Sequence, residues 1–234
     1  TIIAYWGVLK AGAVAVMTNP LDMEKELLHH FNDSGAKVLI TLDLLWPKLQ
    51  PLLSRLGLET IFFTRISDGL RFPLNLLYRL KVAREKSAPN IPFDGDVIRP
   101  WRDLLVSGKP FEPRNLNPAE DLAMLQYTGG TTGVSKGVMI THANLGANVQ
   151  QCQEMLHDLN GSSHTVMGIL PYFHIYGLTV CLNFATSIGA TLAPFPRFVP
   201  TDVLKAVHKI KPTIFPCAPS VFSALLYQKN IEKY

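Results

Sequence analysis

The sequence predicts an α/β fold built from mostly parallel sheets that are covered by helices on both faces. Short β-rich runs alternate with helical runs along most of the chain, and this order requires crossovers between parallel strands. Hydrophobic residues make up 47% and charged residues 17% of the 234 positions. This composition is typical of a folded chain that is long enough to bury a sizeable core.

The first 64 residues begin with a helical run and then alternate strands with helices. The run AVAVMT is β-rich, and the run after it has Glu24, Leu27 and Phe31 at helical spacing before Gly35 ends it. The runs KVLIT and TIFFT are typical of two further strands. The predicted elements, in order, are a helix at 1–10, a strand at 13–18, a helix at 21–33, a strand at 37–41, a helix at 44–56 and a strand at 60–64.

Residues 67–118 interrupt this rhythm, because seven prolines mark irregular connections. We therefore expect an irregular insertion, with short helices at 74–84 and 101–105, between α/β sub-regions at 1–66 and 119–234. The alternation then resumes. The predicted elements that follow are strands at 122–127 and 137–141, a helix at 143–159, a strand at 165–170, a helix at 178–187, a strand at 190–194, a helix at 202–209, a strand at 213–215 and a helix at 220–227.

The charge balance excludes one class of partner. The chain has 22 basic and 18 acidic residues, a net charge of +4, which is too small to indicate nucleic-acid binding. Its three cysteines lie far apart and have no metal-binding spacing. Scattered thiols of this kind indicate a reducing compartment, and we expect a cytoplasmic location.

Two segments raise the question of membrane contact. Residues 65–86 carry six basic and two acidic residues, and Leu74, Leu77 and Leu80 alternate with the cations. This pattern fits either a solvated surface insertion or peripheral contact with anionic lipid. Residues 159–196 contain no Asp, Glu, Lys or Arg, but their prolines and glycines argue against a spanning helix. We expect this stretch to line a pocket.

The strongest chemical signal is the run YTGGTTGVSKG at residues 127–137. Its glycines allow the backbone to turn with positive φ and to approach a ligand closely. Successive free N–H groups in such a loop form an anion-binding nest, and threonine hydroxyls and a lysine add further phosphate donors. The alternative is a flexible turn without function, but the specificity of this eleven-residue run argues against it.

The run does not match the two commonest phosphate-binding fingerprints. The loop of P-loop enzymes places glycine before the lysine and serine or threonine after it, whereas Ser135 precedes Lys136 here and Gly137 follows it. The dinucleotide fingerprint would require glycine in place of Thr128, and it opens into a helix. The present run joins two predicted strands. A P-loop phosphotransferase is therefore disfavoured.

This loop closely resembles the phosphate loop of the acyl-adenylate-forming superfamily, which includes acyl-CoA ligases, beetle luciferases and the adenylation domains of peptide synthetases. The usual family form is Tyr-Thr-Ser/Thr/Gly-Gly-Thr-Thr-Gly-x-Pro-Lys-Gly-Val. This sequence departs from it at Ser135, where proline is commonest. We expect the loop to be slightly more mobile as a result. The resemblance implies that the ATP phosphates are bound by Thr128, Gly129, Gly130, Thr131, Thr132, Gly133, Ser135 and Lys136.

A second segment, LPYFHIYGL at 170–178, resembles the second-substrate motif of the same family. It places one ionisable side chain, His174, among aromatic and aliphatic residues after a predicted strand, where open α/β sheets bind ligands. A lone histidine in apolar surroundings is usually a core residue, but the loop upstream favours a functional role. The resemblance implies that His174 borders the adenylate and gates the acyl site. The neighbouring pocket residues are then Tyr172, Phe173, Ile175 and Tyr176.

A third segment, PCAPS at 216–220, resembles the family segment that walls the acyl tunnel. Cys217 and Ala218 are therefore expected to line the acyl pocket. No paired base accompanies Cys217, so we interpret it as a small wall residue and not as a nucleophile.

The resemblance implies ATP-dependent activation of a carboxylic acid to an acyl-adenylate and then to an acyl-CoA thioester. ATP, Mg²⁺ and coenzyme A would be required, with Thr128 contributing an oxygen to the metal. The motifs are most similar to those of bacterial medium- and long-chain fatty acyl-CoA ligases. The uncharged stretch up to Arg197 offers no aspartate for an amino-acid substrate, which favours a fatty acid over an amino acid and leaves an aryl acid open.

The resemblance covers nearly all of this chain but under half of a typical family member. We therefore expect residues 1–234 to be an incomplete large N-terminal AMP-binding domain of an acyl-CoA synthetase-like fold, inactive by itself. The family's metal-binding Glu motif, ribose-binding Asp and small C-terminal domain are not in this sequence. A non-catalytic nucleotide-binding or membrane-associated module is the remaining alternative.

Overall fold

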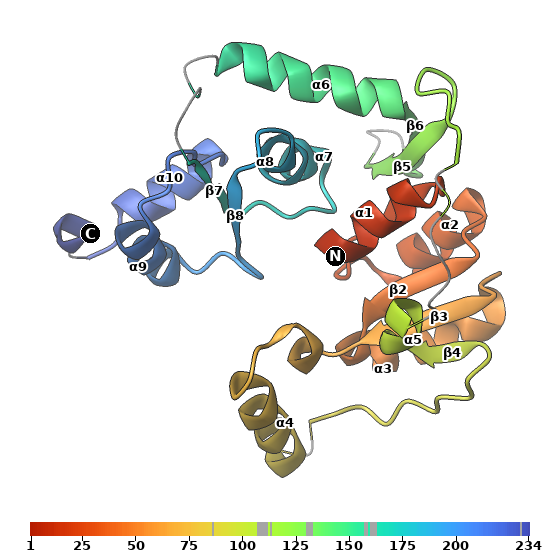
Figure 1. Cartoon of the computed structure of the whole chain (residues 1–234). Helices are drawn as coiled ribbons and strands as arrows, with labels where there is room; N and C mark the ends of the chain where they lie inside the picture. The colour runs from red at the N-terminus through yellow and green to blue at the C-terminus, as the bar shows by residue number, and fades with distance from the viewer. Residues whose placement is uncertain are drawn as a thin grey trace. The chain divides into compact units, whose positions relative to one another are not determined.

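The computed structural model describes residues 1–85, 87–106, 112, 114–129, 133–156, 159, 163–229 and 231–234 (Figure 1). The chain divides into two compact units. Unit 1 comprises residues 1–19, 114–126 and 138–234, and unit 2 comprises residues 20–113 and 127–137. The division passes through strands β5 (Leu122–Thr128) and β6 (Lys136–Thr141), so the connection between these strands belongs to unit 2.

Unit 2 is built on a parallel sheet with the strand order β2-β3-β4. The strands are β2 (Val38–Leu42), β3 (Thr60–Thr64) and β4 (Ile98–Pro100). In the central strand Ile61, Phe62 and Phe63 are all buried, as expected for a strand covered on both faces. Ile61 and Phe63 belong to the main core of the unit. The Phe62 ring lies under the Arg99 guanidinium, 5.6 Å from the ring centroid.

The helices of unit 2 are α2 (Glu24–Ser34), α3 (Trp46–Leu49), α4 (Leu74–Glu85) and α5 (Arg102–Val106). Helices α2 and α3 contribute buried side chains to the core, whereas α4 and α5 bury none. The predicted spacing of α2 is confirmed, because Leu27, Leu28 and Phe31 are buried together in the core. Gly35 ends the helix with a φ of 63°, a left-handed conformation that glycine adopts without strain.

Two expectations for unit 2 are wrong in detail. The continuous helix predicted at 44–56 is broken into a 3-10 turn at Asp43–Leu45, the short helix α3 and a 3-10 segment at Gln50–Arg55. Pro51 lacks the N–H that a continuing α-helix would use, which explains the break. The segment 67–118 is also not wholly irregular, because β4 extends the sheet along β3.

Unit 1 contains the remaining sheets. The strand order β1-β5-β6 includes β1 (Ala15–Met17), and a separate pair joins β7 (Thr165–Gly168) to β8 (Thr191–Pro194). The pairings β1 with β5 and β7 with β8 are parallel. Ala123 and Met124 of β5 and Val166 and Met167 of β7 have no exposed surface. These strands therefore carry the centres of the apolar clusters of unit 1.

The helices of unit 1 are labelled in Figure 1. They are α1 (Ile2–Lys10), α6 (His142–Met155), α7 (Ile175–Gly177), α8 (Phe184–Ser187), α9 (Pro200–Ile210) and α10 (Pro219–Leu226). A π-helical segment, Leu178–Asn183, connects α7 directly to α8, so the helix predicted at 178–187 starts one turn earlier. The strand predicted at 213–215 is reduced to one parallel bridge between Ile214 and Val166.

The parallel strand pairs and the intervening helices confirm the predicted α/β class. Within the described part of the chain, no helix has both the length and the apolar character needed to span a bilayer.

Candidate functional site

The glycine-threonine loop lies between β5 and β6. Thr128 ends β5 and Lys136 begins β6, and the side chains of both are exposed. Gly129 and Gly133 are also exposed, and Gly133 has a φ of 117°, which a residue with a Cβ rarely adopts. The loop therefore exposes the Thr128 hydroxyl, the backbone of the two glycines and the Lys136 ammonium group to solvent. Gly130, Thr131 and Thr132 lie outside the described residues.

Ser135 is held by two consecutive histidines of α2. The His29 Nε2 lies 2.7 Å from the Ser135 carbonyl oxygen, and the His30 Nε2 lies 2.8 Å from the Ser135 hydroxyl. A carbonyl oxygen only accepts, so His29 donates in the first bond. Sequence reasoning did not identify these histidines, because nothing in the local pattern connects α2 to residue 135.

Tyr127 completes this cluster of unit 2. Its ring stacks on His30 with the centroids 4.2 Å apart, and its hydroxyl donates to the Asp33 carboxylate at 2.6 Å. Burial, reinforced by this acceptor, raises the pKa of Tyr127 to about 12. A Cβ at Gly137 would lie 3.1 Å from the Tyr127 ring, so glycine at 137 allows the ring to lie close to the backbone.

His174 lies in unit 1, after β7. It is the N-cap of α7, and its Nδ1 accepts a hydrogen bond from the Tyr176 backbone N–H at 3.2 Å. This bond leaves Nε2 as the proton-bearing nitrogen of the neutral ring. The imidazole and Tyr176 are exposed, whereas Phe173 and Ile175 are half-buried. The segment therefore presents one polar donor beside apolar side chains.

Gln126 supports the same segment and was not predicted. It is a buried residue of β5, and its Nε2 donates to the Phe173 carbonyl oxygen at 3.0 Å. The bond connects the end of β5 to the residue before His174. A glutamine inside the apolar run LAMLQYT is the signal that could have indicated it, since buried amides need partners.

Tyr172 is half-buried, and its hydroxyl oxygen is buried. Its ring packs against two of the apolar clusters, and a Cβ at Gly168 would lie 2.2 Å from its hydroxyl. The close approach therefore requires glycine at 168. Burial raises the pKa of Tyr172 well above its usual value, so this hydroxyl stays protonated and uncharged.

Cys217 and Ala218, which were predicted to line the acyl pocket, come after α9 in the sequence. Cys217 is buried in a cluster with Met167 and Val203, and burial raises the pKa of its thiol. A buried, protonated thiol is a poor nucleophile, which fits the expectation of a structural residue. Ala218 is half-buried and forms the N-cap of α10.

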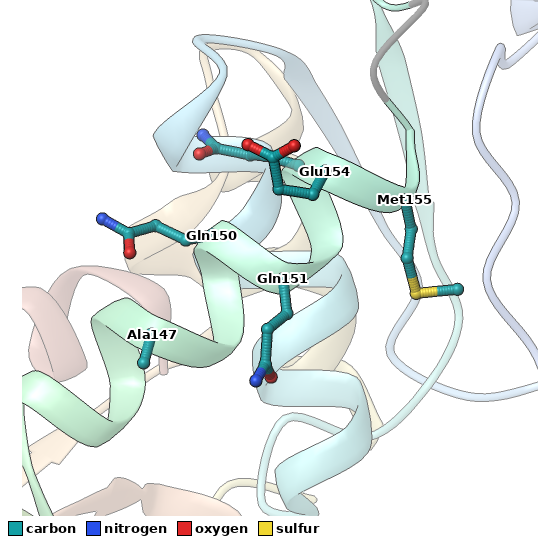
Figure 2. Close-up of a pocket in the computed structure, with 6 residues that line it drawn as sticks. Ala147, Gln150, Gln151, Glu154 and Met155 are labelled. Carbon is teal, nitrogen blue, oxygen red and sulfur yellow. The ribbon is translucent and has the colours of Figure 1, made fainter.

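The predicted site residues thus fall into two groups. Residues 127–137 form a cluster with α2 in unit 2, and the His174 segment packs on β5 and β7 in unit 1. A surface hollow elsewhere lies along α6, where Ala147, Gln150, Gln151, Glu154 and Met155 line it (Figure 2). None of these belongs to the predicted site. Among the described residues, no three His, Cys, Asp or Glu side chains are grouped to hold a metal ion.

Comparison with known proteins gives matches over the whole chain. The family described as AMP-binding enzyme matches residues 1–234. A long-chain-fatty-acid–CoA ligase of Bacillus subtilis (strain 168) is 39% identical over 237 residues, which cover 100% of this chain and 42% of that protein. This chain therefore spans less than half of that relative.

Solved structures agree with the fold. The crystal structure of a long-chain-fatty-acid-CoA ligase from Archaeoglobus fulgidus matches with a TM-score of 0.71 and 27% identity, over 96% of this chain and 39% of that one. The ATP-bound structure of MatB from Rhodopseudomonas palustris also matches with a TM-score of 0.71, at 21% identity, over 97% of this chain and 38% of that one. The second likeness shows the fold alone.

Proposed function

Because this chain belongs to the AMP-binding enzyme family, we propose that the protein carrying it activates a fatty acid with ATP and transfers the acyl group to coenzyme A. The observation that carries this proposal is the loop between β5 and β6, where Thr128, Gly129, Gly133 and Lys136 are exposed together. The fatty-acid assignment draws on the Bacillus subtilis and Archaeoglobus fulgidus ligases. Residues 1–234 alone are proposed to be inactive.

The first step joins the acid to the nucleotide. A carboxylate oxygen forms a bond to the α-phosphorus of ATP, and pyrophosphate leaves with the electron pair of the broken P–O bond. Negative charge collects on the leaving group, so donors fixed at its oxygens lower the barrier. Lys136, the Thr128 hydroxyl and the backbone N–H groups of Gly129 and Gly133 are the proposed donors.

The donor set suits magnesium as well. Mg²⁺ takes oxygen ligands and is usually held by one or two protein groups together with substrate phosphates. The exposed hydroxyl of Thr128 is an oxygen donor of this kind, beside the proposed phosphate site. The bound ion would neutralise part of the charge on the departing pyrophosphate.

The second step forms the thioester. The sulfur of coenzyme A attacks the acyl carbonyl carbon, the thiol proton is released, and AMP leaves. His174 is proposed to border the adenylate, where its Nε2–H can donate to an oxygen of the bound intermediate. Phe173, Ile175 and Tyr176 are proposed to supply the apolar surface beside it, and Tyr172, Cys217 and Ala218 to line the same pocket, so an acyl chain is the substrate that this segment suits.

Peripheral contact with anionic lipid is proposed for α4. None of its residues is buried, and Leu74, Leu77 and Leu80 are exposed together with Arg79 and Lys81. The leucines and cations are mixed around the helix. We therefore expect electrostatic attraction to dominate the contact, and salt to weaken it.

Exchange of labelled pyrophosphate into ATP tests the proposed activity. The full-length protein is incubated with saturated fatty acids of graded length, an aryl acid or an amino acid. Exchange is expected with fatty acids. Exchange with the aryl acid alone would replace the proposal with an aryl-CoA ligase, and ATP binding without any exchange would indicate a non-catalytic module.

Lys136→Ala identifies the site of that activity. Loss of a charged donor to phosphate is expected to raise the KM for ATP about tenfold or more, with a smaller effect on the KM for the acid. Lys205→Ala is the matched control, because Lys205 lies on α9, 3.9 Å from Asp202, and has no role in the proposed site.

A further inference from the structure

The chain just before Lys136 is tethered at two atoms of one residue. The Ser135 carbonyl accepts from His29, and the Ser135 hydroxyl bonds to His30, at 2.7 Å and 2.8 Å. Both histidines belong to α2, which is anchored in the core of unit 2 by Leu27 and Phe31. A two-point tether from a packed helix fixes the position and the direction of this residue.

The surroundings of His30 assign its tautomer. Its Nδ1 lies 3.6 Å from the Asp22 carboxylate, so the ring proton is favoured on that side and Nε2 accepts from the Ser135 hydroxyl. Lys48 in turn donates to the backbone carbonyls of Pro20 and Asp22. His30 is buried, and the stacked Tyr127 ring covers one face. The tether is thus supported by groups on several elements of unit 2.

Serine at 135 leaves the backbone freer than a proline would, because proline fixes φ through its ring. The two histidines supply the missing restraint from outside the loop. We infer that His29 and His30 are positioning residues that hold Ser135, and through it orient Lys136 toward the phosphates of ATP. This inference rests on the proposed function of the loop.

A double-mutant cycle between His30 and Ser135 tests the inference in the full-length protein. His30→Ala removes the bond from the helix side, and Ser135→Ala removes the same bond from the loop side without disturbing the core. Each change is expected to raise the KM for ATP in pyrophosphate exchange about fivefold, the effect of one neutral hydrogen bond. Because the bond is shared, the double variant is expected to show the same fivefold change. The KM for the acid should stay unchanged.

Two further variants separate positioning from general damage. His30→Gln keeps a side-chain nitrogen or oxygen within reach of Ser135 and is expected to retain a KM for ATP close to that of the unmodified protein. Ser135→Pro in the His30→Ala background restrains φ by another route, and it is expected to recover most of the lost affinity. His208→Ala is the matched control, because His208 contacts the Tyr234 carbonyl in unit 1.

Hydrogen–deuterium exchange of the ligand-free protein gives a readout that needs no activity. The peptide covering residues 133–137 is expected to exchange faster in His30→Ala and Ser135→Ala than in His208→Ala. Unchanged exchange in this peptide, or multiplying effects on the KM for ATP in the double variant, would overturn the inference and leave the proposed function intact. Absence of pyrophosphate exchange in the unmodified protein would refute the proposed function. The hydrogen–deuterium exchange rate of residues 133–137 would still decide whether the histidines restrain the loop.

Discussion

His30 shows how one buried residue connects the fold to the phosphate loop. It has Ser135 on one ring nitrogen and Asp22 near the other, and Tyr127 stacks on its face. Burial lowers the pKa of His30 below its usual 6.5, and His29 acts in the same direction. The carboxylates of Asp22, Glu26 and Asp33 oppose this shift but are weaker than the burial effect.

This shift predicts a pH dependence of stability. With the folded-state pKa lowered, the unfolded chain binds the proton at higher pH than the folded chain does. The contribution of His30 is therefore fully present above pH 6.5 and is lost as the pH falls through the lower folded pKa. We expect the difference in thermal midpoint between the unmodified protein and His30→Gln to shift in favour of the variant as the solution is acidified. A difference that does not change with pH would contradict this account.

The predictability of the site also differs from residue to residue. The run at 127–137 and the segment around His174 could be identified because their chemistry is contiguous in the sequence. His29, His30 and Gln126 could not be identified in this way, since their contacts join residues 106, 105 and 47 positions apart. Local patterns carry no information about contacts over such sequence separations. Gln126 is a partial exception, because a glutamine within an apolar run indicates a buried amide that needs a partner.

At the scale of elements, short-range chemistry predicted most helices and strands. The strand at Thr60–Thr64 has the predicted bounds, and α2 ends at the predicted glycine. The failures have physical reasons. Prolines divided the helix predicted at 44–56, and β4 is only three residues long and ends in Pro100, so it had no pattern of its own and depends on pairing with β3.

The segment between β7 and α8 gives a prediction about packing. A Cβ at Gly177 would lie 2.5 Å from the Pro171 carbonyl oxygen and 2.9 Å from the Leu170 Cβ. Backbone must move to relieve such overlap, so Gly177→Ala is expected to destabilise the protein by about 1–3 kcal/mol. Gly146→Ala is the matched control on α6, where a new Cβ would meet nothing within 4 Å. The free energy of unfolding of both variants is measured by chemical denaturation. Equal values would contradict the prediction, because they would show that the backbone around Gly177 accommodates a Cβ without cost.

Helix α4 gives a second prediction at this scale. Reversal of Arg79, Lys81 and Arg84 to glutamate removes the positive charge while the exposed leucines remain. We expect co-sedimentation with vesicles containing anionic lipid to fall strongly for this variant, and to fall for the unmodified protein as salt is raised. Binding that resists both changes would exclude an electrostatic contact, and no binding by either protein would identify α4 as a solvated surface helix.

At the scale of the whole molecule, the alternation of strands and helices predicted the α/β class, and the loop motif pointed to the family. The grouping of residues 127–137 with residues 20–113 could not be predicted. It depends on tertiary contacts, such as the bond from Tyr127 to Asp33, between segments that are far apart in the sequence. Each unit also buries its own apolar clusters, so the proposed phosphate site and the His174 segment are supported by separate cores.

The central claim is that the connection between β5 and β6 binds the phosphates of ATP. A crystal structure of the full-length protein with a non-hydrolysable ATP analogue tests it most directly. We predict that the phosphate oxygens lie within hydrogen-bonding distance of the Lys136 ammonium and the Thr128 hydroxyl, with Ser135 still bound to His29 and His30. An analogue whose phosphates are bound elsewhere in the protein, with this loop making no contact to them, would contradict the account.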